Sequence, residues 1–395
     1  PAIARWSDIE KEIDVPEKRT WTGEWSEFRD PVSGTRVCKL TNYKAHSHHL
    51  YFTNSGWYDG ARRLLLGSDR ENRTCLLSAD LRTHELHQLT GLDLAAPDAA
   101  PAIQSACVNP RRAEFFFCQG RALMALDLDR LESRTLYALP EGFRASMLSC
   151  TADGRYVFTN ISEDLSSRIR MDLAHGYVGF EEVFAAKPLS RILRIAVDGS
   201  GGEVVHEDRV WIGHVNTSPT QSHLLTFCHE GPWNQVDNRI WGMDVESGKI
   251  WKIRARRCEG EAVGHEYWHA DGVHLGYHGR RPDGYKFFGK VRYDDTENVE
   301  VSFPHVTGHI HSNDSRLIVG DGGKVVRLWK WNGQGYDGPR VLCQHRCSAH
   351  CQQLHVHPRF SPDGKQVLFT SDMSGYGQVY LADVADFESL PPAEN

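Results

Sequence analysis

Hydrophobic and polar residues alternate over short runs along most of the chain. The segment Arg239–Val245 reads Arg-Ile-Trp-Gly-Met-Asp-Val, an alternation that places successive side chains on opposite faces of an extended strand. Turn-forming pairs such as Asp-Gly and Asn-Asp bound these runs, which is typical of strands rather than helices. The pattern therefore predicts an all-β protein.

The predicted strands recur in a repeated unit. Its clearest copy is a turn at Ser361–Gly364 followed by strands at Gln366–Thr370 and Gln378–Val384. Further copies begin near Tyr58, Asn109, Thr151, Leu224, Ala270 and Asn313. A period of about 40 to 50 residues made of short strands is typical of a β-propeller. We therefore predict a seven-bladed β-propeller.

The ends of the chain suggest how the ring closes. The run Arg36–Thr41 reads as a strand that joins the last blade and removes its exposed edge. We expect tails at residues 1–20 and 388–395 and a single propeller domain over residues 21–387. Residues 163–189 read as a charged, partly helical insertion in one blade.

Composition excludes several classes of partner. The net charge of -7 argues against a broad basic surface for nucleic acid, and no apolar run is long enough to span a membrane. The N-terminus lacks the pattern of a secretory signal, so we expect a cytoplasmic protein. The ten cysteines contain no CxxC pair and read as buried thiols. The group Cys343, Cys347 and Cys351 leaves two readings, a separate zinc site or a loop with incidental thiols.

The 21 histidines carry the functional signal. His265 and His357 each stand six residues before the Asp of an Asp-Gly turn, and His309, His355 and His214 fall near the same phase. Equivalent positions in different blades surround the central channel, so these side chains should converge. Three imidazoles without acidic partners, His309, His355 and His357, predict a divalent metal. An isolated histidine in a channel has a simpler explanation, as a hydrogen-bonded core residue.

Several strings in the chain resemble the oligogalacturonate lyases, a family of metal-dependent, seven-bladed propeller lyases that act on short pectin fragments. The strings that carry the resemblance are Trp211–His214, Phe227–Pro232 with Arg239–Trp241, Glu259–Trp268, Ile318–Gly322, and Gln352–His357 with Phe369–Asp372. The likeness runs through most of the chain.

The resemblance implies a set of site residues. It places the metal ligands on His309, Gln352, His355 and His357, the general base on His265, and an arginine of the site on Arg239. It implies Mn²⁺ as the first choice, with Zn²⁺, Ca²⁺, Co²⁺ and Ni²⁺ as alternatives. We expect substrate contacts from His214, His229, Glu230 and His49. The alternatives are a hydrogen-bonded channel histidine for His265 and an exposed strand arginine for Arg239.

The expected reaction is β-elimination of short oligogalacturonides to 4,5-unsaturated uronates. Hydrolysis would need a facing pair of carboxyl groups, and no such pair is obvious in the sequence. Two alternatives remain: elimination on another uronate-containing oligosaccharide, and a propeller that only binds its partners. The oligomeric state stays open.

Overall fold

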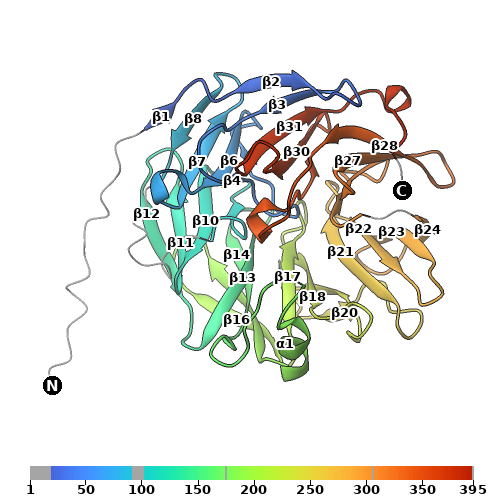
Figure 1. Cartoon of the computed structure of the whole chain (residues 1–395). Helices are drawn as coiled ribbons and strands as arrows, with labels where there is room; N and C mark the ends of the chain where they lie inside the picture. Colours follow the sequence, from blue (N-terminus) through green and yellow to red (C-terminus); the bar gives the residue numbers. More distant parts are fainter. Residues whose placement is uncertain (1–18, 91–101, 174–175, 305–306, 394–395) are drawn as a thin grey trace.

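The computed structural model describes residues 19–90, 102–173, 176–304 and 307–393. Within these ranges the strands form seven antiparallel sheets arranged in a ring, as Figure 1 shows. This confirms the prediction of a seven-bladed, almost entirely β propeller. One α-helix, α1 (Phe180–Ala186), lies between β14 and β15, within the insertion expected at residues 163–189.

The first four sheets follow one another along the chain. The first contains β1 (Thr20–Trp21), β4 (Ser47–His48), β5 (Trp57–Tyr58), β6 (Arg63–Ser68), β7 (Cys75–Asp80) and β8 (Glu85–Gln88). The second contains β9 (Cys107–Val108), β10 (Glu114–Gln119), β11 (Ala122–Asp127) and β12 (Ser133–Ala138). The third contains β13 (Phe143–Cys150), β14 (Tyr156–Glu163), β15 (Ser190–Ala196) and β16 (Gly202–Asp208). The fourth contains β17 (Ile212–Thr217), β18 (Leu224–His229), β19 (Ile240–Asp244) and β20 (Ile250–Lys252).

The last three sheets complete the ring. The fifth contains β21 (Ala262–Trp268), β22 (His274–Arg280), β23 (Lys286–Arg292) and β24 (Val299–Ser302). The sixth contains β25 (Ile310–His311), β26 (Leu317–Gly322), β27 (Val325–Trp331) and β28 (Tyr336–Gln344). The seventh contains β2 (Ser26–Arg29), β3 (Arg36–Lys39), β29 (Arg359–Phe360), β30 (Gln366–Ser371) and β31 (Gln378–Asp383). Short 3-10 helices occur at η2 (Arg70–Asn72), η4 (Gln352–Leu354) and η5 (Phe387–Ser389).

Both chain ends contact the seventh blade or its neighbours. The strand expected at Arg36–Thr41 is β3, which pairs with β31 through Val37 opposite Ala382, and Figure 1 shows the two side by side. The residues expected as an N-terminal tail lie mostly outside the described residues, although β1 pairs with β8. At the other end, Leu390 is buried and the backbone of Val341 donates to Pro391, so this segment packs on β28 up to Ala393.

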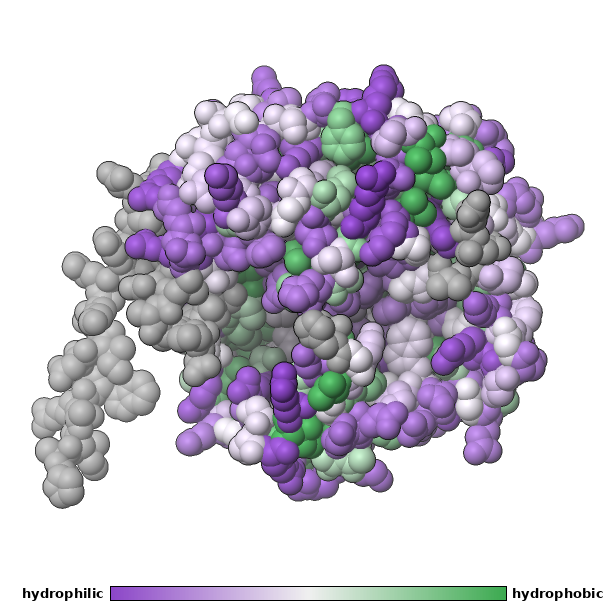
Figure 2. All heavy atoms as spheres, in the orientation of Figure 1, coloured by the Kyte–Doolittle hydropathy of each residue, from purple (hydrophilic) through white to green (hydrophobic). Residues whose placement is uncertain are grey.

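The hydrophobic core lies between neighbouring blades. One cluster joins Phe116 and Leu123 of the second sheet to Val157 and Leu193 of the third. Such packing follows from the alternation along each strand, because both faces of a blade press against other blades. Hydrophilic residues cover most of the face seen in Figure 2, and the surface is hollowed near its centre.

The cysteines are unpaired in the structure. All ten cysteines are free and most are buried; in the Cys343 to Cys351 loop, the Cys347 thiol donates to the Leu354 carbonyl at 2.6 Å. In the described part of the chain, no helix has the length and apolar character needed to cross a membrane.

Candidate metal centre and active site

Three histidines from two neighbouring blades meet near the channel. His309 immediately precedes β25, and His355 and His357 precede β29. Their ring centroids lie 4.2 Å apart for His309 and His357, 5.5 Å for His355 and His357, and 5.9 Å for His309 and His355. One ligand atom from each lies within 4.8 Å of the others, as the histidine phase predicted.

The donor set fits a divalent transition metal. Nε2 of His357 is buried and has no hydrogen-bond partner among the residues that the structure describes, so it is available as a ligand. The group contains only imidazoles, while Asp321 stands behind it and lies 3.2 Å from Nδ1 of His309. A carboxylate that fixes the far nitrogen of a ligating histidine is the usual support of such sites. Burial acts to raise the pKa of Asp321, but His309 outweighs it and the pKa lies below its ordinary value.

The fourth predicted ligand, Gln352, lies in η4 beside this group. Its backbone carbonyl accepts from the backbone N–H of His355 at 3.1 Å and from Nε2 of Gln104 at 2.9 Å. The same Gln104 nitrogen lies 3.4 Å from Nδ1 of His357. A second amide, which the sequence did not single out, therefore lies against the histidine cluster.

Three site histidines have left-handed backbone conformations. The φ angles are 48° for His214, 52° for His265 and 43° for His357. His214 and His265 lie where β17 and β21 shift register against the next strand, at corresponding points of adjacent blades. Bulges re-aim side chains, and such backbone strain concentrates at functional sites. The fold therefore turns these imidazoles toward the channel at a cost in local conformation.

His265 lies directly beside the metal-binding group. Its ring centroid is 4.6 Å from that of His309 and 4.8 Å from the Trp233 ring. Nδ1 of His265 lies 2.9 Å from Nε2 of His278, so the two imidazoles share one hydrogen bond. Burial, reinforced by the neighbouring His309, lowers the pKa of His265 well below its ordinary value.

Arg239 is buried between two carboxylates. Its NH1 donates to Glu230 at 2.7 Å and its Nε donates to Glu266 at 3.1 Å. His214 approaches both acids, with Nδ1 3.6 Å from Glu266 and Nε2 3.7 Å from Glu230. Arg239 is 4 % exposed, so it is not the solvent-exposed strand arginine of the alternative reading.

A second group, His214, Cys228 and Glu266, also has metal-like spacing. Burial raises the pKa of the Cys228 thiol well above its ordinary value, which keeps the thiol protonated. Arg239 already neutralises Glu266. The spacing of these three residues is therefore explained by the ion pairs around Arg239, without a second metal ion.

His49 and His229 lie in other surroundings. Both ring nitrogens of His49 form hydrogen bonds inside the protein. Nδ1 lies 2.7 Å from Oγ1 of Thr370, and Nε2 lies 2.9 Å from the His357 carbonyl oxygen. It therefore supports the His357 backbone and has no ring nitrogen left for a sugar, contrary to the expected substrate contact. His229 contacts Asp237 at 2.6 Å and stacks on Trp241 within its own blade.

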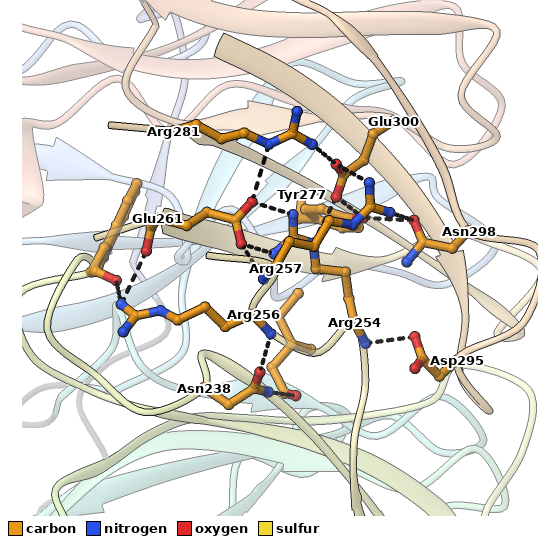
Figure 3. A network of polar contacts seen from close by, with 12 residues as sticks. Asn238, Arg254, Arg256, Arg257, Glu261, Tyr277, Arg281, Asp295, Asn298 and Glu300 are labelled. Atoms are coloured by element: carbon orange, nitrogen blue, oxygen red, sulfur yellow. Dashed lines mark hydrogen bonds and ion pairs between the residues drawn. The ribbon is translucent and has the colours of Figure 1, made fainter. Parts of the chain in front are cut away.

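Figure 3 shows an ionic network around Glu261, the residue before β21, and Glu300 of β24. NH2 of Arg254 donates to Glu261 at 2.7 Å, and its Nε donates to Glu300 at 2.6 Å. Arg256 donates to the carbonyl oxygens of Trp233 and Glu261 at 3.2 and 3.0 Å. The network thus ties the Trp233 loop to the start of the strand that carries His265.

The sequence did not single out several residues that complete the site. Tyr51, whose ring lies 4.8 Å from that of His357, and His278 occupy positions without a repeated phase. Asp321 and Glu266 lie within strings that carried the family resemblance, and those strings were the available signal.

The fold and the site together define a seven-bladed propeller with a cluster of three histidines, spaced to hold a metal ion, and a buried arginine. The oligogalacturonate lyase family model matches residues 18–337. The chain therefore belongs to the oligogalacturonate lyase family.

Individual relatives agree over nearly their whole length. The oligogalacturonide lyase of Pectobacterium atrosepticum is 26% identical over 91% of this chain and 96% of its own, and the oligogalacturonate lyase of Dickeya dadantii gives the same values. A solved oligogalacturonate lyase in complex with manganese superposes with a TM-score of 0.84 at 24% identity, covering 94% of this chain and 98% of its own. The oligogalacturonate lyase of Vibrio parahaemolyticus superposes with a TM-score of 0.83 at 25% identity, covering 94% and 99%.

Proposed function

We propose that this protein cleaves short oligogalacturonides by β-elimination and requires a divalent metal ion. The observation that carries the proposal is the cluster of His309, His355 and His357, whose ligand atoms lie within 4.8 Å of one another beside His265. The family supplies the substrate class.

His309, His355, His357 and Gln352 would hold the ion, and Mn²⁺ is the first choice because a solved relative is complexed with manganese. When bound, such an ion neutralises the C6 carboxylate of the sugar and stabilises the negative charge that develops there. Imidazole and amide ligands bring no negative charge, so they would leave the positive charge of the ion available to an anionic substrate.

His265 would remove the C5 proton. Its lowered pKa keeps the imidazole unprotonated near neutral pH, which is the form a base requires. When Nδ1 of His265 donates to Nε2 of His278, the proton of the neutral ring is held on that side. Nε2 of His265 is then free to accept the proton while the C4–O bond breaks. The products are a 4,5-unsaturated uronate and a sugar whose leaving oxygen takes up a proton.

Arg239 would orient a sugar carboxylate or stabilise the leaving oxygen. Glu230 and Glu266 fix its guanidinium from two sides, so the side chain is ordered before substrate arrives. Glu230 would therefore act through Arg239, and His214 would complete this side of the site.

The test is the ultraviolet absorbance of unsaturated uronate during incubation with di- and trigalacturonate. Protein loaded with Mn²⁺ is compared with chelated protein, with His265→Ala, and with His223→Ala as a matched control outside the site. We expect product from loaded wild type and from His223→Ala, and a loss of product in the other two samples.

Failure of the loaded wild type to release unsaturated product from any oligogalacturonate would overturn the proposal. The same assay on other uronate oligosaccharides would then test the first alternative. Full activity after chelation would exclude the metal dependence while leaving elimination intact.

A further inference from the structure

A cavity of about 940 Å³ lies beside the proposed base. Its lining includes Trp233, His278, Arg280, Lys286 and the start of α1, and we call it the Trp233 cavity. Trp233 and His278 both contact His265, so the cavity adjoins the reaction site. Its volume falls within the range of small-molecule sites, about 300–1,000 Å³.

Two cations in the wall of this cavity face each other, and none of the described residues supplies a counterion. Arg280 of β22 and Lys286 of β23 are direct partners in the antiparallel register. Neither side chain forms an ion pair or hydrogen bond with any residue that the structure describes. Like charges directly opposite each other destabilise a sheet, so a bound anion would relieve this pair.

Strand alternation separates Arg280 from its neighbour. Arg281 points into the ionic network of Figure 3, where it donates to Glu300 at 2.9 Å. Arg280 therefore faces the opposite way, on the same side of β22 as His278, about 7 Å further along the strand. Of two consecutive arginines, one is committed to buried carboxylates and the other lines the cavity.

The charged residues that line the two cavities near the site differ. Glu181 and Glu182 of α1 also line the Trp233 cavity, but neither forms an ion pair with Arg280 or Lys286. A second cavity, of about 560 Å³, includes Tyr51, His214 and Gln352 in its lining. The described residues that line this second cavity include no Arg or Lys.

We propose that Arg280 and Lys286 form a carboxylate subsite for a third uronate, outside the two sugars joined by the scissile bond. This inference rests on the proposed function. Arg presents a planar fork that matches a carboxylate, and Lys adds a second charge beside it. Trp233 also lines this cavity, and its ring centroid lies 4.8 Å from that of His265.

The test compares Arg280→Gln/Lys286→Gln with wild type on digalacturonate and trigalacturonate. We expect the KM for trigalacturonate to rise by about tenfold at unchanged kcat, and the KM for digalacturonate to stay the same. Added salt should raise the trigalacturonate KM of wild type more than that of the variant, since exposed charges are screened. Lys290→Gln/Lys365→Gln removes the same charge outside the cavity and should leave both constants unchanged.

Equal changes on both substrates, or no change on either, would overturn the third-uronate subsite. If loaded wild type cleaves neither substrate, the proposed function fails, and calorimetric binding of trigalacturonate then decides the subsite by itself. Tighter binding to wild type than to the double variant would keep it, and equal binding would reject it.

Discussion

Adding one methyl group at Gly264 should displace the indole beside the proposed base. A Cβ at this position would lie 2.3 Å from Cζ2 and 2.4 Å from Cε2 of Trp233. Carbon atoms in contact lie about 3.5 to 4.0 Å apart, so Gly264→Ala requires the ring to move by about 1 Å or more. The Trp233 ring contacts His265 at 4.8 Å and lies under Arg239, so this movement reaches both proposed catalytic side chains.

We expect Gly264→Ala to lower kcat/KM by about 100-fold, which corresponds to about 2.7 kcal/mol of transition-state stabilisation. Overpacking should lower the free energy of unfolding by about 1–3 kcal/mol. Metal content should stay at the wild-type level, because the atoms nearest to the new Cβ belong to Trp233 and not to the proposed ligands His309, His355 and His357. The measurements are the product-absorbance assay, denaturant unfolding and elemental analysis. Gly335→Ala is the matched control, since a Cβ there meets nothing within 4 Å.

A double-mutant cycle tests the physical cause. In a Trp233→Phe background the smaller ring leaves room, so Gly264→Ala should cost less activity than it does in wild type. Wild-type kcat/KM in Gly264→Ala, or the same penalty in both backgrounds, would refute the displacement of Trp233.

Three further outcomes follow from the structure. His357→Ala should weaken Mn²⁺ binding by about 100-fold or more in calorimetry, because it removes a buried imidazole ligand; wild-type affinity would exclude His357 from the centre. Arg254→Met should lower the free energy of unfolding by about 2–3 kcal/mol while sparing metal content, because it removes the buried cation that pairs with Glu261 and Glu300 and leaves only the more exposed Arg281 and Arg257 beside them; a loss below about 1 kcal/mol in denaturant unfolding would contradict this. Burial lowers the pKa of His269 to about 4, so the unfolded chain binds more protons between pH 4 and about 6.5 and stability falls as pH drops through that window. Between pH 7 and 5 the free energy of unfolding of His269→Gln should therefore fall by about 2 kcal/mol less than that of wild type. Equal falls in thermal unfolding would contradict the lowered pKa of His269.

The repeated strand pattern was sufficient to predict the ring, because each blade is specified locally by alternation and a turn. The histidine phase likewise predicted that His309, His355 and His357 would meet, since equivalent positions of a propeller surround one channel. Contacts made by residues outside that phase were not predictable in this way. The hydrogen bond between His265 and His278 depends on the bulge in β21, and a bulge cannot be predicted from the alternation of hydrophobic and polar residues.

Burial also separated residues that the sequence treated alike. His49 and His265 are both histidines near a channel, yet the first has both ring nitrogens bonded within the protein. The second is left with one nitrogen free of protein hydrogen bonds in the described contacts. The difference comes from Thr370 and the His357 carbonyl, which lie more than 300 residues from His49 along the chain.

A recurrent Gly-His pair explains how three blades deliver ordered imidazoles to one place. The pairs are Gly213-His214, Gly264-His265 and Gly308-His309. At each glycine a side chain occupies the space that a Cβ would need, and these occupants are Glu230 at 3.0 Å, Trp233 at 2.3 Å and Asp321 at 2.8 Å. Each occupant also contacts the adjacent histidine, at 3.7 Å for Glu230, 4.8 Å between rings for Trp233 and 3.2 Å for Asp321. The glycine thus admits the group that contacts the histidine after it, so the Gly-His pair, rather than the histidine alone, recurs at this site in three successive blades.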